Sequence, residues 1–375
     1  MLTGQNGILN RASDAKEKTE ESSKEEQRKL AQAEALMSTE KTTYKGVTLP
    51  EGFAPTKIDG EDSVDDGLVI TDGYGNEYVW VEVPKILDIY KTTGLNISNF
   101  TEDVYIKIET DLRSYISKYR PNENFKDVYY ENDTDGWFEN EEEYNNEKNR
   151  MLKSIYLNGG FFVGRYEAGI SVNREISKDT TEVPVSKANM YPYTYVTRTQ
   201  AKVLAEKVKS GSYTSGLIFG LQWDLILTFL CNTGNIDYDI LLKKSTTIGN
   251  YYDSKFILKR GRFALRKDLL NWHEFNSNEK SDFVYNKIKN SQTSFLEAIL
   301  LTTGATETSK LQNIYDIAGN VGEWTLEGAK IDGEIFCVSR GGDFGDKGEY
   351  VTACSRASRK KENKESYVGF RVVMY

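Results

Sequence analysis

The residues best placed for chemistry lie near the C-terminal end of the chain, in the run Asn313-Ile-Tyr-Asp-Ile-Ala-Gly-Asn-Val-Gly-Glu-Trp324. Its two glycines permit backbone turns that a β-carbon would hinder. Asn320 and Glu323 therefore present side-chain oxygens on a turn, and hard metal ions take oxygen atoms as ligands. Alternatively, Asn320 caps the turn and Glu323 pairs with an arginine of the core, for instance Arg340 or Arg371.

A second oxygen-rich stretch is Glu131-Asn-Asp-Thr-Asp-Gly-Trp-Phe-Glu-Asn-Glu-Glu142. It places oxygens at loop positions 1, 3, 5, 9 and 12 and a glycine at position 6, which is the spacing of a calcium-binding EF-hand loop. Asp133, Asp135 and Glu142 would be among the ligands. Position 1 is Glu rather than Asp, and no clear helix enters the loop. The alternative is an acidic turn whose carboxylates favour the N-terminus of a following helix.

Groups for covalent catalysis are sparse. The chain has three Cys (Cys231, Cys337 and Cys354), too few for a disulfide scaffold, and one His, His273. Cys337 and Cys354 flank an Arg-Gly-Gly turn, and they either pair or stay buried thiols. No serine nucleophile elbow, Cys-x-x-Cys pair or phosphate loop is present. Carboxylates are so numerous that proximity in sequence selects none of them.

Charge excludes one class of partner. The net charge of −9 argues against nucleic acid, whose binding needs clustered Lys and Arg. The last stretch differs, since from Arg340 to Tyr375 there are 8 Lys and Arg against 5 Asp and Glu. Five of these cations would meet an acidic partner or an anionic glycan, or form a solvated loop: Arg356, Arg359, Lys360, Lys361 and Lys364.

Local sequence patterns predict the helices and strands that must position these residues. Two β-rich runs within residues 67–83, joined by Asp72-Gly-Tyr-Gly-Asn, predict a hairpin. Residues 368–373 predict a closing strand. Helices are predicted at residues 141–157, 197–208 and 221–230. Residues 85–150 are predicted to be an acidic insertion after the hairpin. Residues 232–312 are loop-rich, as binding surfaces on a rigid frame often are.

Residues 1–43 differ from the rest of the chain. Apart from two glycines near the start, the run is rich in Ala, Glu, Lys and Gln, with acid-to-base pairs four apart that support a solvated helix. Its apolar positions are sparse and predict only a thin packing face, which includes Leu30, Ala33 and Leu36. A charged, partly disordered tail is the alternative. The sequence has no run of about 18 apolar residues, the length that spans a bilayer.

Several motifs in order resemble the formylglycine-generating enzyme (sulfatase-modifying factor) family, a branch of the C-type-lectin-like fold. They are Gly159-Gly-Phe-Phe-Val-Gly-Arg-Tyr-Glu-Ala168, Pro192-Tyr-Thr-Tyr-Val, Gln222-Trp-Asp, Tyr315-Asp-Ile-Ala-Gly-Asn-Val-Gly-Glu-Trp, Arg340-Gly-Gly-Asp-Phe, Arg356-Ala-Ser-Arg and Gly369-Phe-Arg-Val-Val. The resemblance covers about residues 66–375. It implies an α+β, C-type-lectin-like domain at residues 44–375.

The same resemblance bears on activity. Copper-dependent members need two thiolates near the end of the chain, but Arg356 or Ser355 stands at the place of the catalytic Cys and only Cys354 lies close. Iron-dependent relatives need several His ligands, and His273 is alone. We therefore expect a protein that is not an enzyme. The family's structural calcium site implies calcium at Asn320 and Glu323, the expected cofactor.

The fold also serves as the variable ligand-binding protein of diversity-generating retroelements. Residues 343–367 would correspond to that binding surface. The expected ligand-binding residues are Asp343, Arg356, Arg359, Lys360 and Tyr367.

A separate resemblance concerns the N-terminus. The run that starts Leu2-Thr-Gly-Gln-Asn-Gly-Ile-Leu-Asn-Arg-Ala-Ser-Asp looks like the segment after the hydrophobic helix of type IV pilin-like proteins of Gram-positive bacteria. It implies that a leader peptide and an apolar helix precede this segment in the native protein, which would be its one connection to a membrane.

Together these features predict a non-catalytic, extracellular pilin-like subunit of the cell surface or a pilus. Residues 1–43 would join other pilin-like subunits, and the C-type-lectin-like head would serve filament structure, adhesion or the binding of a surface glycan or protein. The alternative is a secreted, metal-dependent oxidase of the formylglycine-generating type that acts on protein Cys.

Overall fold

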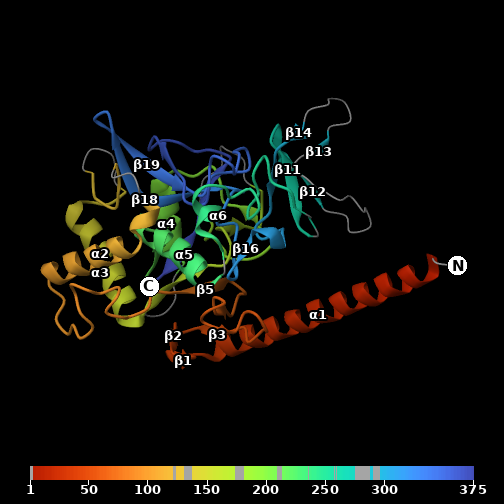
Figure 1. Cartoon of the computed structure of the whole chain (residues 1–375), viewed down its shortest axis with the longest axis horizontal. Coiled ribbons are helices and arrows are strands. Elements are labelled where there is room, and N and C mark those ends of the chain that lie inside the picture. Colours follow the sequence, from red (N-terminus) through yellow and green to blue (C-terminus); the bar gives the residue numbers. More distant parts are fainter. Residues whose placement is uncertain are drawn as a thin grey trace.

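The computed structural model combines helices and sheets in one head, with a long helix beside it (Figure 1). It describes residues 3–120, 124–130, 137–173, 181–208, 213–234, 236–256, 258, 260–274, 288–289 and 296–375. The helices are α1 (Thr3–Met37), α2 (Glu102–Tyr115), α3 (Glu141–Asn158), α4 (Arg198–Glu206), α5 (Gly220–Thr233) and α6 (Tyr238–Leu242), with short 3-10 turns at Ser117–Tyr119 and Glu307–Ser309.

A six-stranded sheet forms the core of the head. Its order is β10 (Ser215–Leu217), β22 (Val372–Met374), β7 (Gly160–Gly164), β5 (Glu77–Glu82), β4 (Val69–Asp72) and β3 (Phe53–Pro55). The central strands β5 and β7 carry Val, Trp and Phe side chains that are almost wholly buried. The predicted hairpin is confirmed, since β4 and β5 pair antiparallel around the Asp72–Asn76 turn.

A second sheet carries the C-terminal motifs. Its order is β20 (Arg356–Arg359), β19 (Glu334–Arg340), β18 (Gly322–Ile331) and β21 (Val368–Phe370), and β6 (Phe125–Lys126) also pairs with β18. The register of β18 and β19 shifts between Thr325 and Gly328, a bulge that sets Glu327 apart from the regular ladder. The predicted acidic insertion thus contributes a strand to this sheet.

The predicted closing strand is in fact divided between the two sheets. Val368–Phe370 pairs parallel with β18, whereas Val372–Met374 pairs antiparallel with β7 and β10. Arg371 lies at the crossover, and its side chain is fully buried. It donates to both oxygens of Glu323, at 2.6 Å and 3.0 Å. One short β-branched run therefore ties both sheets together.

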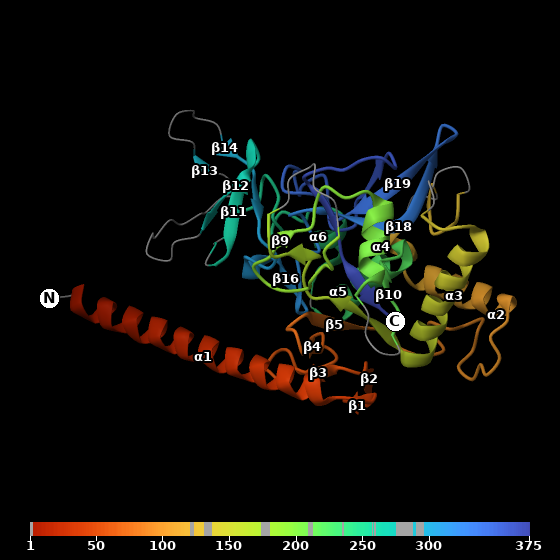
Figure 2. The ribbon, with the colours of Figure 1, turned by 180° about the vertical axis from the view of Figure 1, so that it is seen from behind.

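The three predicted helices are present as α3, α4 and α5. Asn140 caps α3, and a full capping box of Thr197 and Gln200 starts α4. α5 is buried from Gly220 to Leu230, and both oxygens of Asp127 accept from its first backbone N–H groups. α2 and α3 lie side by side at one end of the head, as seen from behind in Figure 2.

Smaller strand pairs surround these two sheets. A three-stranded sheet consists of β12 (Asp268–Glu274), β11 (Arg262–Leu265) and β15 (Ile299–Leu301). The two-stranded pairs are β1 (Thr42–Tyr44) with β2 (Val47–Leu49), β8 (Gly169–Ile170) with β9 (Tyr191–Pro192), β13 (Ile288–Lys289) with β14 (Leu296–Glu297), and β16 (Lys310–Leu311) with β17 (Ile314–Tyr315).

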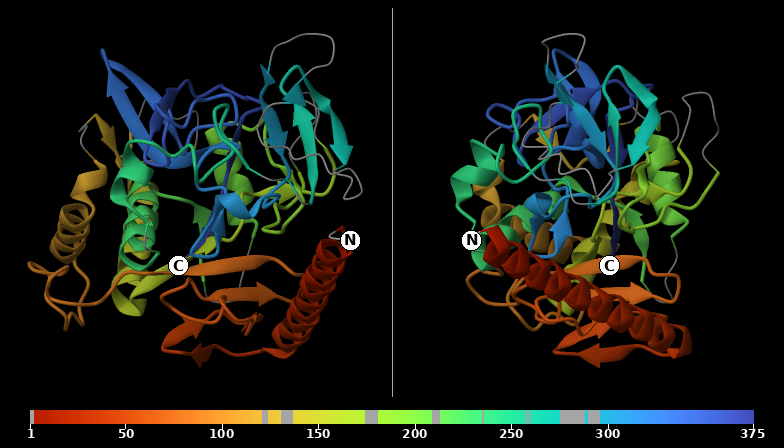
Figure 3. Two further views of the ribbon diagram at one scale, coloured as in Figure 1. Left: turned by 45° about the vertical axis from the view of Figure 1, so that its right-hand side comes forward. Right: turned by 90° about the vertical axis from the view of Figure 1, so that its right-hand side faces the viewer.

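α1 docks on the head through its C-terminal third only. Residues 12–27 are exposed, and α1 contacts β3 and β4 after that point (Figure 3). The docking face includes Arg28, Ala31 and Ala35, and the side chain of Leu36 lies against Gly73, whereas Leu30 is 61% exposed. Of the expected apolar residues, Leu30 and Ala33 are exposed and Leu36 contacts the head. None of the helices in the described residues is both long and apolar enough to cross a membrane.

Arg28 completes a nearly buried group of two arginines and two glutamates. It donates to Glu61 at 2.6 Å and to Glu77 at 2.7 Å. Arg165 donates to the same two carboxylates, at 2.8 Å and 3.0 Å. Burial alone would raise the pKa of Glu61, but Arg165 and Arg28 hold it below its usual value. The helix therefore supplies half of the positive charge that the two glutamates need.

We predict that Arg28→Ala loosens α1 from the head, because one glutamate charge is left uncompensated. Breaking a buried ion pair costs about 3–5 kcal/mol, and the lower end applies here because the Arg28 side chain is 26% exposed. Hydrogen exchange at residues 28–37 should speed up. The control is Lys57→Ala, which removes an exposed ion pair to Glu34 and should cost less than about 1 kcal/mol. Equal effects of the two variants would contradict the role of burial.

A buried glutamate on α3 makes stability depend on pH. Burial raises the pKa of Glu147 to about 7, although Lys202 acts in the opposite direction and Tyr375 donates to Oε1 at 3.3 Å. The unfolded chain releases this proton near pH 4.5, and the folded chain only near pH 7. Stability from this group is therefore full below pH 4.5 and is lost as pH rises to 7.

We predict that Glu147→Gln is more stable than the wild type at pH 8, by up to about 3 kcal/mol, because it removes the cost of a buried charge. Near pH 4.5 the two proteins should unfold alike. Urea unfolding at both pH values measures this, with the exposed Glu141→Gln as control. A gain of the same size at both pH values would rule out ionisation as its cause.

Candidate ligand-binding cleft

A cleft of about 630 Å³ lies beside the second sheet. Its walls come from β20, the loop at residues 342–346 and the turn between β11 and β12. Four predicted ligand-binding residues line it: Asp343, Arg356, Arg359 and Tyr367. Lys360 follows β20, is exposed and is not among the lining residues. The volume falls in the range of about 300–1,000 Å³ that is typical of small-molecule sites.

Asp343 is the most perturbed carboxyl group of the cleft. Its Oδ1 accepts from the backbone N–H of Gly345 at 2.8 Å, and its own N–H donates to Asp346 Oδ2 at 3.1 Å. Burial and the neighbouring Asp346 raise the pKa of Asp343 to about 6, against the opposing effect of Arg359 and Arg266. Its charge therefore changes in a mildly acidic range, which is a common property of functional sites.

Arg359 and Tyr367 form one corner of the cleft. Arg359 Nε donates to Ser339 Oγ at 2.7 Å, and its guanidinium lies 5.1 Å from the centre of the Tyr367 ring. Nη2 approaches Asp343 Oδ2 at 4.0 Å. These contacts fix the direction of the guanidinium, since it is held on a hydroxyl, an aromatic face and a carboxylate at once.

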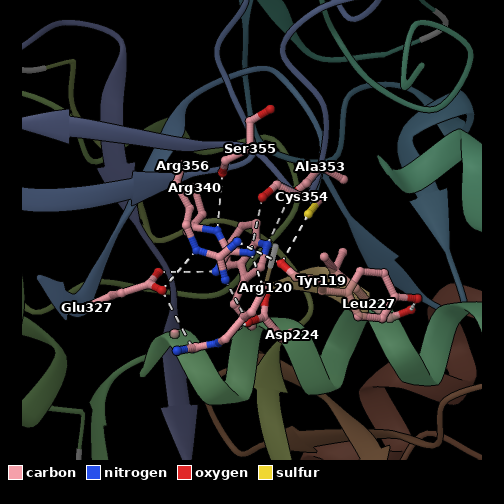
Figure 4. A network of polar contacts seen from close by, with 12 residues as sticks. Tyr119, Arg120, Asp224, Leu227, Glu327, Arg340, Ala353, Cys354, Ser355 and Arg356 are labelled. Atoms are coloured by element: carbon pink, nitrogen blue, oxygen red, sulfur yellow. Dashed lines mark hydrogen bonds and ion pairs between the residues drawn. The ribbon is translucent and has the colours of Figure 1, made fainter. Parts of the chain in front are cut away.

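Arg356 lines the cleft but is already engaged below it (Figure 4). It donates to Asp224 at 2.7 Å, to Glu327 at 2.9 Å and to the carbonyl of Tyr119 at 2.8 Å. Arg340 contacts the same two carboxylates, at 2.6 Å and 3.3 Å. Arg356 thus serves as the floor, and most of its charge is neutralised from inside the protein.

Asp224 and Glu327 hold Arg356 from beneath the cleft, and the sequence analysis missed both of them. Both are fully buried, and Arg120 also donates to Asp224, at 2.7 Å. Burial alone would raise the pKa of Asp224, but Arg340, Arg356 and Arg120 hold it below its usual value. The signal that could have found Asp224 is the motif Gln222-Trp-Asp, which places a carboxylate in an otherwise apolar helix.

The glycine-rich turn lies outside the cleft lining, in the core. Gly319 has φ 70°, and a β-carbon there would collide with the backbone of Asn250. Asn320 donates to Glu167 at 2.7 Å, and its oxygen accepts from Asn250 and from the N–H of Leu301. Glu323 pairs with Arg371, one of the two arginines considered. A calcium ion at this turn would have to replace these contacts, and calcium binding there stays a prediction.

The second calcium prediction is described only in part. Asp133 and Asp135 lie outside the described residues. Glu142 is in the first turn of α3, where Asn140 forms the cap. In the part of the chain that the structure describes, no group of three or more His, Cys, Asp and Glu side chains is arranged to hold a metal ion.

The three cysteines are free thiols. Cys354 is buried, and its Sγ donates to the carbonyl of Tyr119 at 3.6 Å; burial raises its pKa. Cys231 accepts from the Tyr119 hydroxyl at 3.0 Å. Among the described residues, neither Cys nor His lines the cleft.

A larger hollow of about 1,080 Å³ lies between α1 and the head. Its floor includes Arg165, Tyr166 and Tyr315, whose side chains are already engaged with one another and with Glu77 or Glu307. We regard it as the junction of helix and head, because its deepest polar groups have partners.

The comparison with protein families concerns the part of the chain that builds the cleft. Residues 265–375 match the sulfatase-modifying factor enzyme 1-like domain. Every residue that lines the cleft lies within this sulfatase-modifying-factor-like region, from Arg266 to Tyr367. No curated protein matches the chain.

Two solved structures resemble the chain weakly. The crystal structure of CarF is 13% identical, with a TM-score of 0.30, and the match covers 57% of this chain and 85% of CarF. The Treponema denticola variable protein 1 is 14% identical, with a TM-score of 0.31, over 57% of this chain and 84% of its own.

We predict that Arg340→Ala destabilises the sulfatase-modifying-factor-like region, because Asp224 and Glu327 keep their buried charges with less compensation. The expected loss is about 3–5 kcal/mol. Urea unfolding at pH 7.5 measures this loss, with the exposed Lys364→Ala as control. An Arg340→Ala loss below 1 kcal/mol would contradict the network's role.

Proposed function

We propose that the protein is a non-catalytic, extracellular binding protein whose C-type-lectin-like head takes a ligand in the cleft. The observation that carries this proposal is the cleft itself. It gathers Asp343, Arg359 and Tyr367 from one C-terminal stretch on a rigid frame, and its volume suits a small ligand or the end of a larger one.

The side chains of the cleft also favour binding over oxidation of protein Cys. The lining offers guanidinium, carboxylate and hydroxyl groups, which recognise polar ligands reversibly. Cys354 stands closest in sequence to the catalytic position of the family, but it is buried and directed at Tyr119. A buried thiol with a raised pKa is a poor nucleophile and a poor ligand for a soft metal.

α1 supports a pilin-like role for the N-terminal segment. Its exposed half extends beyond the head, and only the part from Arg28 onward docks (Figures 1 and 2). This arrangement leaves residues 12–27 accessible to other subunits of a filament on a Gram-positive cell surface. The head would then act as an adhesive or structural subunit.

Binding of labelled protein to an array of immobilised glycans and peptides tests this function. We expect binding that weakens at least about tenfold in Arg359→Gln, since a charge-assisted contact is worth about 1.5–3 kcal/mol. Lys330→Ala, exposed at the far end of β18, is the matched control. Melting curves of each variant show that the fold is kept.

The alternative function is tested in parallel. The protein is incubated with copper(I), dioxygen and a Cys-containing peptide, and mass spectrometry follows conversion of Cys to formylglycine. Conversion by the wild type without any binding to the array would overturn the proposed function.

A further inference from the structure

Arg266 differs from every other charged side chain of the cleft. Asp343, Asp346, Arg356 and Arg359 each have at least one hydrogen bond inside the protein. The exposed guanidinium of Arg266 forms no hydrogen bond or ion pair with any part of the chain that the structure describes, although it lines the cleft. A cation that lines a cleft without a hydrogen-bond partner is available to an anionic ligand.

Arg266 also lies close to the perturbed carboxyl group. A β-carbon on Gly345 would meet Nη1 of Arg266 at 2.8 Å and Oδ1 of Asp343 at 3.1 Å, so both groups approach the same glycine. On the other oxygen of Asp343, Nη2 of Arg359 stands 4.0 Å away. The cleft thus places the carboxylate of Asp343 between the guanidinium groups of Arg266 and Arg359. Neither guanidinium lies closer than 4.0 Å to that carboxylate.

The remaining polar groups of the cleft can form hydrogen bonds with a sugar. Asp343 and Asp346 accept hydrogen bonds, which adjacent sugar hydroxyls can donate. Ser366 adds a hydroxyl that can donate or accept, and the ring of Tyr350 is 74% exposed at the cleft, where it can cover the apolar face of a sugar ring. An acidic peptide would also bring carboxylates to Arg266, but it offers single backbone N–H donors in place of the adjacent hydroxyls of a sugar ring, so the lining favours a sugar.

We propose that the cleft binds a sugar that carries a carboxylate, with this carboxylate on Arg266 and its hydroxyls on Asp343 and Asp346. The proposal rests on the proposed binding function and names its ligand class. It assigns a role to Arg266, which comes from the β11–β12 turn and lies outside the C-terminal stretch at residues 343–367.

The same geometry makes binding depend on pH. Asp343 competes with the ligand carboxylate for Arg266 and Arg359 while it is ionised. The other groups that face it are Asp346, which raises its pKa, and Tyr251 on the neighbouring loop. Since the pKa of Asp343 is about 6, it becomes neutral below that value, whereas a sugar carboxylate stays charged. Binding should therefore be tighter at pH 5 than at pH 7.5.

The test is calorimetric titration of the full chain with three oligosaccharides, which carry galacturonate, glucuronate or N-acetylneuraminate. The methyl ester of each acid serves as a neutral ligand of the same shape. At least one acid should bind at least about tenfold more tightly than its ester, because the ester cannot form a charge-assisted contact. Affinity for that acid should rise from pH 7.5 to pH 5.

Variants separate the site from the rest of the surface. Arg266→Ala should lose about tenfold in affinity for the acid, and Arg266→Lys should restore part of it. Lys347→Ala removes an exposed cation that directly follows the loop at residues 342–346 and does not line the cleft, and this variant should bind as the wild type does. Asp343→Asn should bind at pH 7.5 as the wild type does at pH 5, with no further change on acidification.

Each contrary result has a distinct meaning. Equal binding of acid and ester, unchanged affinity of Arg266→Ala, or no binding of any of the three acids overturns the sugar proposal. If the protein instead binds an acidic peptide or a neutral glycan on the array and Arg359→Gln loses it, the binding function stands and only the ligand class fails. Conversion of a Cys-containing peptide without binding means that both fail.

Discussion

The carboxylate of Asp224 is buried in the middle of an apolar helix, and it is tolerable there only because three guanidinium groups surround it. An isolated charge in such a place would cost several kcal/mol. Arg120 comes from the segment after α2, Arg340 from the end of β19 and Arg356 from the start of β20, so this one carboxylate holds three distant segments against α5. The bulge that sets Glu327 apart from the ladder adds the second carboxylate that these arginines need. The position of β20, and with it one wall of the cleft, depends on this network of buried ion pairs.

The charged residues of the cleft differ in what they bind. Arg356 directs its hydrogen bonds to the core, so the backbone of β20 is fixed and the floor of the cleft is almost neutral. Arg359, three residues along, is held on Ser339 and the ring of Tyr367. Arg266 is the least restrained charge, because its side chain has no hydrogen bond or ion pair with the described residues. A site of this kind can change its ligand through the outer side chains while the inner ones keep the frame, because the two sets do not share partners.

The sequence was sufficient where the signal was local. The turn Asp72-Gly-Tyr-Gly-Asn predicted the β4–β5 hairpin, and the local pattern of apolar residues predicted α3, α4 and α5. The stretch at residues 343–367 supplied most of the cleft. Long-range features were out of reach. Arg266 lines the cleft only because the fold brings the β11–β12 turn there. The strand at residues 368–374 divides at Arg371 because two sheets meet there. α1 docks through Arg28 because the carboxylates of Glu61 and Glu77 bind its guanidinium. A pattern of charges in one segment does not reveal which buried charge elsewhere it balances.

The junction of α1 with the head has a mechanical consequence. Arg28 binds Glu77, the first residue of the central strand β5, and Glu61, which lies in the turn between β3 and β4. Arg165 directly follows β7 and binds the same two glutamates. The helix is therefore linked to the centre of the six-stranded sheet and also to the turn that follows its edge strand β3. A pull on α1 would therefore reach the head at two places at once, at β5 through Glu77 and at the β3–β4 turn through Glu61. The ion pairs of Arg28 would have to break before the helix leaves the head.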